Sequence, residues 1–200
     1  MISETLDMQD IGKYLQGLIS KQMSVTEKAA RYLGVTPRYP TLTGYDPSLL
    51  DTQIMGYEAE MESIIGPNIV IAYNPAVALN PKMREKVPAH EGVHLAQLGK
   101  NKVSKIRALT PFGYFHLGHS LIDGGAEVIL ERIGEGRTGA YEREYRFAEY
   151  FDREIMDLGD LYKMAEYRGT DALIDFLNKP EVNKKLYRAL LENYVNDVKN

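Results

Sequence analysis

Two histidines four residues apart, His90 and His94, constrain this chain more than any other feature of its sequence. They belong to the run His-Glu-Gly-Val-His, and residues i and i+4 of an α-helix lie on the same face. Both imidazoles can then bind one metal ion, and Glu91, at the edge of that face, can reach a water molecule on the metal. The run therefore predicts a helix that carries two metal ligands and a general base. The alternative is a helix whose histidines are solvated or hydrogen-bonded in the core.

The residues around the motif predict where this helix begins and ends. Pro88 suits the first helical turn, where the missing N–H of proline costs nothing. Gly99 is a natural stop for a helix. We therefore expect a helix of about three turns from Pro88 to Leu98.

Composition limits what else could hold a metal or attract a partner. The chain has no cysteine, so histidine and carboxylate must supply any transition-metal site. The net charge of −4 argues against non-specific binding of nucleic acid, which needs a basic surface. No apolar run approaches the roughly 18 residues of a membrane span, and the first residues lack the basic start of a signal peptide. A cytoplasmic protein without nucleic-acid or membrane partners is expected.

The hydrophobic pattern predicts an α+β fold that is predominantly helical. The clearest strand covers 68–74, just before the metal-binding helix, and either offers a free edge to an extended peptide or lies in the core. The stretch 55–65 is ambiguous between strand and helix. We expect a single domain over 1–200, with an upper lobe of about 1–99 that holds the sheet and a lower helical lobe of about 100–200.

Further helices are expected in both lobes. One covers 5–23, and a second covers 24–33 because Ser24 and Glu27 form a capping box at its start. The segment 101–118 is expected to be a partly irregular linker packed over the site. The pattern also predicts downstream helices over 119–133, 140–158, 160–177 and 180–199.

A catalytic zinc site needs a third protein ligand, which must come from further along the chain. Asp123, Glu127 and Glu131 are spaced by four, so they share one helix face. Such a face is either an exposed acidic stripe or a set of carboxylates that lies in front of a cation. The small residues 124–126 let another helix approach and favour the cation. The candidates for the third ligand are His116, His119, Asp123 and Glu127.

The motif is not that of a metzincin, because Gln97 and Lys100 stand where that class has glycine and histidine. Taken together, His-Glu-Gly-Val-His at 90–94 and Gly-Gly-Ala-Glu at 124–127 resemble the gluzincin metallopeptidases, the clan of thermolysin and the minigluzincins. The resemblance covers about residues 68–133. It implies a zincin-like catalytic domain with a small sheet next to the active-site helix.

The resemblance also implies a set of zinc ligands. In that clan the two histidines of the motif and a glutamate from a later helix bind Zn²⁺, which makes His90, His94 and Glu127 the expected ligands. An acidic residue four positions after that glutamate commonly orients a ligand histidine. Glu131 occupies this place, and Asp123 is a second candidate for the same orienting role.

The expected activity is zinc-dependent hydrolysis of peptide bonds in a peptide or protein substrate. Zinc activates a water molecule, and Glu91 accepts its proton as general base and passes it to the leaving nitrogen. The developing oxyanion needs another donor, for which His119, Tyr141 and Tyr145 are the candidates. The alternative function is a non-catalytic zinc-binding interaction module, or a latent enzyme whose own chain blocks the cleft. The sequence predicts no oligomeric state.

Overall fold

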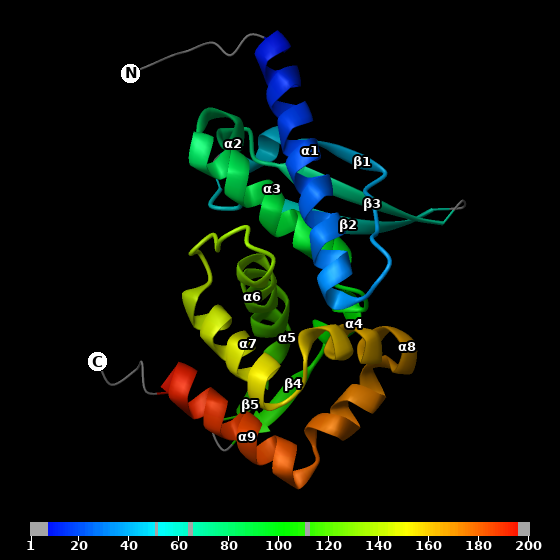
Figure 1. Cartoon of the computed structure of the whole chain (residues 1–200), viewed down its shortest axis with the longest axis vertical. Helices are drawn as coiled ribbons and strands as arrows, with labels where there is room; N and C mark the ends of the chain where they lie inside the picture. Colours follow the sequence, from blue (N-terminus) through cyan, green and yellow to red (C-terminus); the bar gives the residue numbers. More distant parts are fainter. Residues whose placement is uncertain (1–7, 51, 64–65, 111–112, 196–200) are drawn as a thin grey trace.

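Helix α3 (Pro81–Ala96) lies where an upper and a lower group of elements meet (Figure 1). The structure is a computed structural model that describes residues 8–50, 52–63, 66–110 and 113–195. Before α3, the upper group comprises α1 (Met8–Leu33), β1 (Leu42–Tyr45), a 3-10 turn (Pro47–Leu49), β2 (Gly56–Ser63), β3 (Gly66–Tyr73) and α2 (Ala76–Leu79). The lower group comprises α4 (Lys100–Val103), β4 (Arg107–Thr110), β5 (Gly113–His116), α5 (Leu117–His119), a π-helical segment η2 (Ser120–Gly124), α6 (Gly125–Arg132), α7 (Glu142–Glu154), α8 (Leu158–Leu177), α9 (Pro180–Leu190) and a second π-helical segment η3 (Leu191–Val195).

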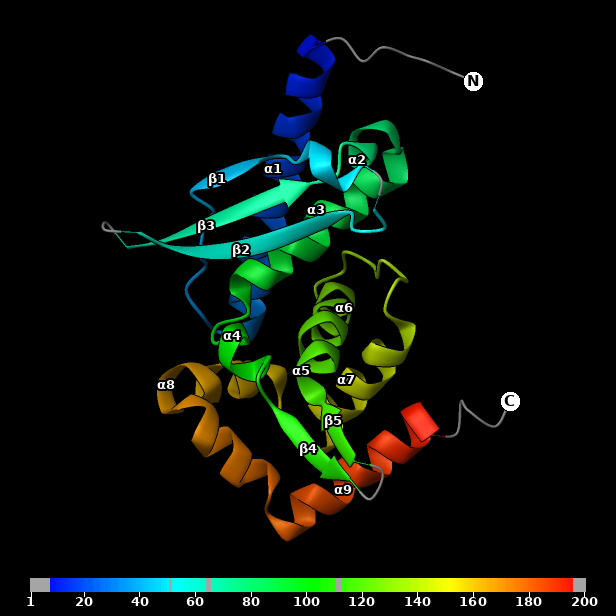
Figure 2. The same ribbon diagram turned by 180° about the vertical axis from the view of Figure 1, so that it is seen from behind.

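The described residues of the upper group form a three-stranded sheet in the order β1-β3-β2, which lies across α1 and α3 (Figure 2). β3 pairs with β1 in parallel and with β2 in antiparallel orientation. Ile69, Ile71 and Tyr73 alternate along β3 and are buried together on one face. The strand predicted over 68–74 is confirmed, but it is central and has no free edge. Within the ambiguous stretch 55–65, residues 56–63 form the antiparallel strand β2 at an edge of the sheet, and residues 64–65 lie outside the described part of the chain.

Helix α1 is one continuous helix, so the predicted break between 5–23 and 24–33 is wrong. The buried positions Leu18, Val25 and Ala29 run through the expected boundary at helical spacing. Burial of one uninterrupted face outweighs the local preference of a capping box. The upper part of the chain therefore presents a 26-residue rod that packs along α3.

Helix α3 begins at Pro81, two turns before the predicted start at Pro88. The Asn80 side chain accepts hydrogen bonds from two backbone N–H groups of the first turn, and Pro81 takes the position that suits proline. Pro88 lies inside the helix and is buried. The helix ends at Ala96, two residues before the predicted end, and Gly99 follows with a left-handed φ of 66°.

The lower group is mostly helical, as predicted, but the expected irregular linker over 101–118 contains α4 and the β4–β5 hairpin. The helix predicted over 119–133 corresponds to α5, η2 and α6 in succession, with the π-helical segment as a feature that the sequence did not predict. The helices predicted over 140–158 and 160–177 correspond to α7 and α8. The helix predicted over 180–199 is α9 followed by η3, and residues 196–199 lie outside the described part of the chain.

A single cluster of buried apolar side chains connects the two groups of elements. It includes Val25 and Ala29 of α1, Val93 of α3 and Leu130 of α6, and it continues into α7, α8 and α9. This shared core fixes α3 against α6. Within the described ranges, no helix has both the length and the apolar character required to cross a bilayer.

Candidate metal centre

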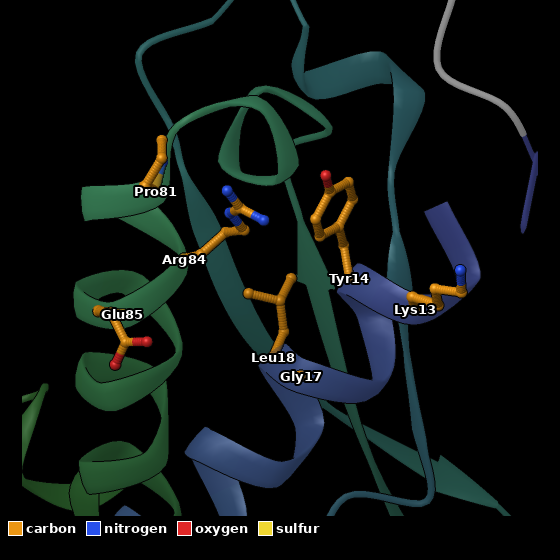
Figure 3. Close-up of a pocket in the computed structure, with 7 residues that line it drawn as sticks. All are labelled: Lys13, Tyr14, Gly17, Leu18, Pro81, Arg84 and Glu85. Carbon is orange, nitrogen blue, oxygen red and sulfur yellow. The ribbon is translucent and has the colours of Figure 1, made fainter. Parts of the chain in front are cut away.

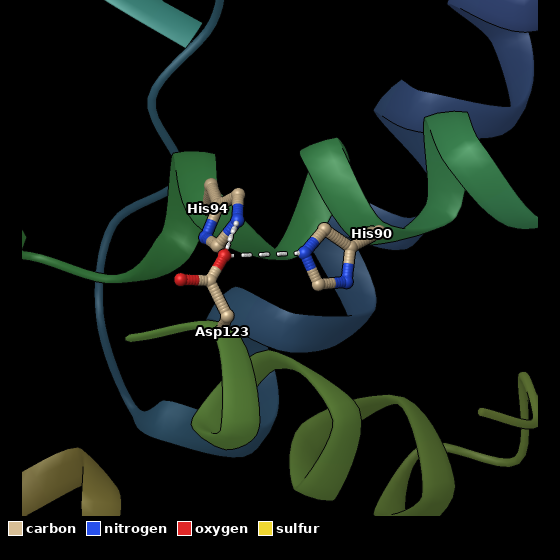
Figure 4. Close-up of side chains that lie close together, drawn as sticks. All are labelled: His90, His94 and Asp123. Carbon is tan, nitrogen blue, oxygen red and sulfur yellow. Dashed lines mark ion pairs between the residues drawn. The ribbon is translucent and has the colours of Figure 1, made fainter. Parts of the chain in front are cut away.

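Three ligating atoms converge between α3 and the η2 segment. Asp123 Oδ1 lies 3.6 Å from His90 Nε2 and 3.5 Å from His94 Nε2 (Figure 4). The ligating atoms of the three residues all lie within 4.8 Å of one another. Two atoms that each lie about 2.0–2.2 Å from a zinc ion at the tetrahedral angle are about 3.4 Å apart. The group could therefore hold a metal ion without a large rearrangement.

The outer nitrogen of each imidazole has its own partner. His90 Nδ1 lies 3.0 Å from Glu127 Oε1, and His94 Nδ1 lies 2.6 Å from Gln97 Oε1. The Gln97 amide donates to the Ile122 carbonyl and to the Tyr162 hydroxyl, so its oxygen must accept from His94. With Nδ1 protonated, Nε2 keeps its lone pair, which is the form that binds a metal.

His90 Nε2 is the atom whose surroundings most favour a bound ion. It is buried and finds no hydrogen-bond partner within the described part of the chain. A buried nitrogen without a partner is costly, and such atoms often mark an ion or water site. A metal ion at the convergence point would satisfy it.

Asp123 is presented by the π-helical segment, a geometry that is frequent at functional sites. Its other oxygen, Oδ2, lies 2.6 Å from His119 Nδ1. The neighbouring glycines allow close packing, because a Cβ at Gly124 would lie 2.1 Å from the Glu144 carbonyl oxygen and one at Gly125 would lie 2.4 Å from the Tyr162 hydroxyl. Gly124 and Gly125 thus allow α7 and α8 to pack closely against the segment that carries Asp123.

The carboxylate of Glu127 does not converge with the other ligating atoms, although the sequence predicted it as the third ligand. It accepts hydrogen bonds from Thr138 N at 2.7 Å, Thr138 Oγ1 at 2.6 Å and Gly139 N at 3.3 Å, besides its contact with His90. Only 1% of Glu127 is exposed. In this structure Asp123, another of the candidates for the third ligand, converges with the two Nε2 atoms, whereas Glu127 contacts the outer nitrogen of His90.

Glu131 and Tyr145 are also placed differently from the prediction. The Tyr145 hydroxyl donates to Glu131 Oε2 at 2.7 Å, and the Arg137 guanidinium lies 4.0 Å from the centre of the Tyr145 ring. Glu131 is therefore hydrogen-bonded to a tyrosine and not to either histidine of the motif. The Tyr145 hydroxyl already donates its hydrogen to Glu131. His116 lies exposed at the end of β5, outside the converging group.

The contact of Gln97 with His94 was not predicted from the sequence. In the sequence, Gln97 was used only as evidence against a metzincin. The available indication was its position three residues after His94, which places both on one side of a helical turn.

Glu91 lies beside the converging group and is 5% exposed. Its Oε1 faces Gly56 of β2, where an added Cβ would lie 3.1 Å away. Its Oε2 is buried and finds no hydrogen-bond partner in the described ranges. The motif thus brings the predicted general base to the same site as the two histidines.

Two hollows adjoin Glu91. One, of about 250 Å³, is lined by the converging group and is polar in character. The other, of about 310 Å³, is mainly apolar, and Met55, Val87 and Ala140 contribute to its wall. Tyr141 lines both, and its ring stacks on His90 with centroids 5.2 Å apart. No residue of α1 lines either hollow, so within the described part of the chain α1 does not cover the site.

The charges around the imidazoles favour a cation. Burial lowers the pKa of His90, but its contacts with Asp123 and Glu127 outweigh burial and raise that pKa to about 9. Burial raises the pKa of Asp123, whereas its contacts with three histidines, that with His119 first, hold it well below the usual range. Burial, together with the neighbouring carboxylates, raises the pKa of Tyr141 to about 12. A dication bound by the Nε2 atoms would replace the proton that this negative field otherwise attracts.

Comparisons of the chain with protein-family models, with curated proteins and with solved structures give no match, so the geometry of this site is the basis for a functional assignment.

Proposed function

We propose that this protein is a zinc-dependent metallopeptidase in which His90, His94 and Asp123 hold the metal ion. The observation that carries the proposal is the convergence of these three side chains with both Nδ1 atoms already partnered. Two histidines and one carboxylate, with an acid beside them, form the ligand pattern of a catalytic rather than a structural zinc site. The sequence resemblance to gluzincins supports the class of enzyme and the two histidine ligands, and the geometry favours Asp123 over Glu127 as the third ligand.

The chemistry follows from the positions of the side chains. When bound, a zinc ion acts as a Lewis acid that lowers the pKa of water from about 15.7 to about 7 and polarises a carbonyl group. Glu91 accepts the proton of the attacking water and delivers it to the leaving nitrogen. Glu127 and Gln97 keep the two imidazoles in the orientation and tautomer that the reaction needs.

Tyr141 is the best placed of the three candidate donors to the oxyanion. Tyr145 is bonded to Glu131, and His119 is bonded to Asp123. Tyr141 lines both hollows next to Glu91, and a phenol is a hydrogen-bond donor at neutral pH. We assign it the role of stabilising the negative charge that develops on the substrate carbonyl oxygen.

The surroundings of Glu91 suit an extended peptide. β2 is an edge strand of the sheet, and its first residue, Gly56, lies against Glu91. An edge strand can pair with an extended chain through backbone hydrogen bonds, and the absent side chain at Gly56 leaves room for a close approach. The mainly apolar hollow would take an uncharged side chain next to the bond that is cut.

The decisive experiment compares the wild type with Glu91→Gln. We expect both proteins to bind one zinc ion with similar affinity, measured by metal analysis and competition with a chelator. Cleavage of a peptide library should fall by roughly 10²–10⁴-fold in Glu91→Gln, because a general base is lost and no ligand is removed. Zinc bound at one equivalent by a wild type that cleaves no peptide would instead favour the non-catalytic interaction module.

A further inference from the structure

A second group of buried polar atoms lies between α1, α3 and β3. Gln22 of α1 and Tyr73 of β3 are both fully buried, and the Tyr73 hydroxyl donates to Gln22 Oε1 at 2.5 Å. Tyr45 is the register partner of Tyr73 in the neighbouring strand, so the two tyrosines point to the same face of the sheet. Glu91 faces this region from α3, as its contact with the edge of the sheet shows.

Three polar atoms of this group are buried without a protein partner in the ranges that the structure describes. They are Gln22 Nε2, Tyr45 Oη and Glu91 Oε2. Such atoms are rare in folded proteins because leaving them unpaired is costly, and three in one region point to a common explanation. The set combines one amide donor, one carboxylate acceptor and a hydroxyl that does both.

Glu91 and Tyr73 lie close together, because a Cβ at Gly56 would be 3.1 Å from Glu91 Oε1 and 3.2 Å from the Tyr73 ring. Burial raises the pKa of Tyr73 well above its ordinary value, and the charges of Glu91 and Tyr45 raise it further. A shared electrostatic environment of this kind is expected when the groups face one interior space.

Gln22 lies where α1 and α3 are in direct contact. The Thr26 hydroxyl lies 2.9 Å from both the Gln22 and the Gly92 carbonyl oxygens, so its one hydrogen is shared between an acceptor on α1 and an acceptor on α3. A Cβ at Gly92 would lie 2.6 Å from the Gln22 carbonyl oxygen, so the two helices are already in contact there. The backbone of Gln22 is therefore held next to the residue that follows Glu91, and the hydrogen bond from Tyr73 holds the side-chain oxygen.

We propose that ordered internal water links Gln22 Nε2 and the Tyr45 hydroxyl to Glu91 Oε2. Buried water typically makes two to four hydrogen bonds to polar groups that otherwise lack partners, and this region supplies that number. The water would hold one oxygen of Glu91 in place while the other faces the hollows. If Glu91 is the general base, which rests on the proposed function, Gln22 and Tyr45 are positioning residues that act through it.

Thermal unfolding of Tyr45→Phe tests the water itself, without any assay of activity. A hydroxyl that binds water contributes to stability, so its removal should lower Tm by about 2–4 °C. Tyr73→Phe, which removes a hydroxyl with a known protein partner, is the reference for such a loss. A Tm for Tyr45→Phe that is unchanged or raised would show that the hydroxyl was unpaired, and would overturn the proposal.

A double-variant cycle tests the link between α1 and β1. If one water network joins the two residues, Tyr45→Phe combined with Gln22→Met should lower Tm by less than the sum of the single changes. Strict additivity would mean that the two residues do not share the water. A high-resolution crystal structure without water near Gln22 Nε2 would contradict the proposal directly.

The positioning role has a separate kinetic test. Tyr45→Phe should lower kcat several-fold at full zinc occupancy and leave KM unchanged, because only the carboxylate of Glu91 loses its support. A rise in KM with unchanged kcat would exclude this role. If the wild type cleaves no peptide, the proposed function fails, while the unfolding and crystallographic tests still decide whether the water is present.

Discussion

Two hollows of equal volume, about 310 Å³ each, lie against different ends of α3. The first is formed by the beginning of α3 and by α1, where the Arg84 guanidinium lies 4.3 Å from the centre of the Tyr14 ring (Figure 3). The second lies against the later half of α3, beside Glu91. Size therefore does not distinguish them.

Their polar groups do distinguish them. In the first hollow the charged side chains are partnered or open to water, as for Glu85, whose side chain is 71% exposed. Beside the second, His90 Nε2 is buried and lacks a partner in the described part of the chain. Buried polar atoms without a protein partner are typical of a binding site, because a ligand or ion can satisfy them. No described residue that lines the hollow beside Arg84 has such an atom.

The largest expected difference concerns metal affinity. Asp123→Ala should weaken zinc binding by at least roughly 1,000-fold, because it removes a ligand, whereas Glu127→Ala should weaken it by about 10–100-fold, as expected for an orienting partner. Arg84→Ala, at the other hollow, should leave the affinity unchanged. Competition with a chromogenic chelator measures all three. The reverse order, with Glu127→Ala the more damaging change, would restore Glu127 as the ligand.

The second expected difference between the two regions is the effect on stability of replacing a glycine with alanine. Gly92→Ala should destabilise the protein by about 1–3 kcal/mol, because the new Cβ would meet the Gln22 carbonyl oxygen at 2.6 Å. Gly17→Ala, beside the first hollow, has open space around it and should stabilise the helix by about 0.5–1 kcal/mol. Urea unfolding measures both changes in the free energy of unfolding. Effects of the same sign would show that α1 and α3 are packed less tightly at Gly92 than in this structure.

The smallest difference concerns the two carboxylates that share Lys21. Lys21 Nζ lies 3.4 Å from Glu85 Oε2 at the first hollow and 2.6 Å from Glu135 Oε2, whose side chain is 8% exposed and which also bonds Lys28. Glu135→Gln should cost about 1 kcal/mol, and Glu85→Gln less than about 0.5 kcal/mol, because exposed ion pairs contribute little.

The effect of Glu135 should depend on pH in a defined direction. Burial raises its pKa, but the hydrogen bonds from Lys21 and Lys28 outweigh burial and bring it below the ordinary value of 4.5. A lowered pKa in the folded state stabilises the protein above pH 4.5, and this stabilisation is lost as the pH falls through the folded-state value. The difference in unfolding free energy between wild type and Glu135→Gln should therefore shrink below pH 4.5. A difference that stays constant down to pH 3 would contradict this assignment.

Elements with a strong local pattern could be predicted from the sequence, and those that depend on distant packing could not. The apolar run over 68–74, bounded by Pro67 and Pro75, was sufficient to predict β3. The boundary expected at Ser24 failed because the buried face of α1 continues onto α3, and the start expected at Pro88 failed because Asn80 supplies a cap two turns earlier. In each failure a local preference was outweighed by burial or by a better cap elsewhere.

The sequence by itself determined that His90, Glu91 and His94 would share one helical site, because the period of the α-helix is fixed by its backbone. Only the tertiary structure decided which acid would meet the histidines. Asp123 and Glu127 have the same spacing pattern, and the choice depends on how η2 and α6 are turned against α3. The π-helical segment contributes to that rotation, and so does the close packing of Gly124 against Glu144, a contact with a separate helix that the local sequence pattern does not specify.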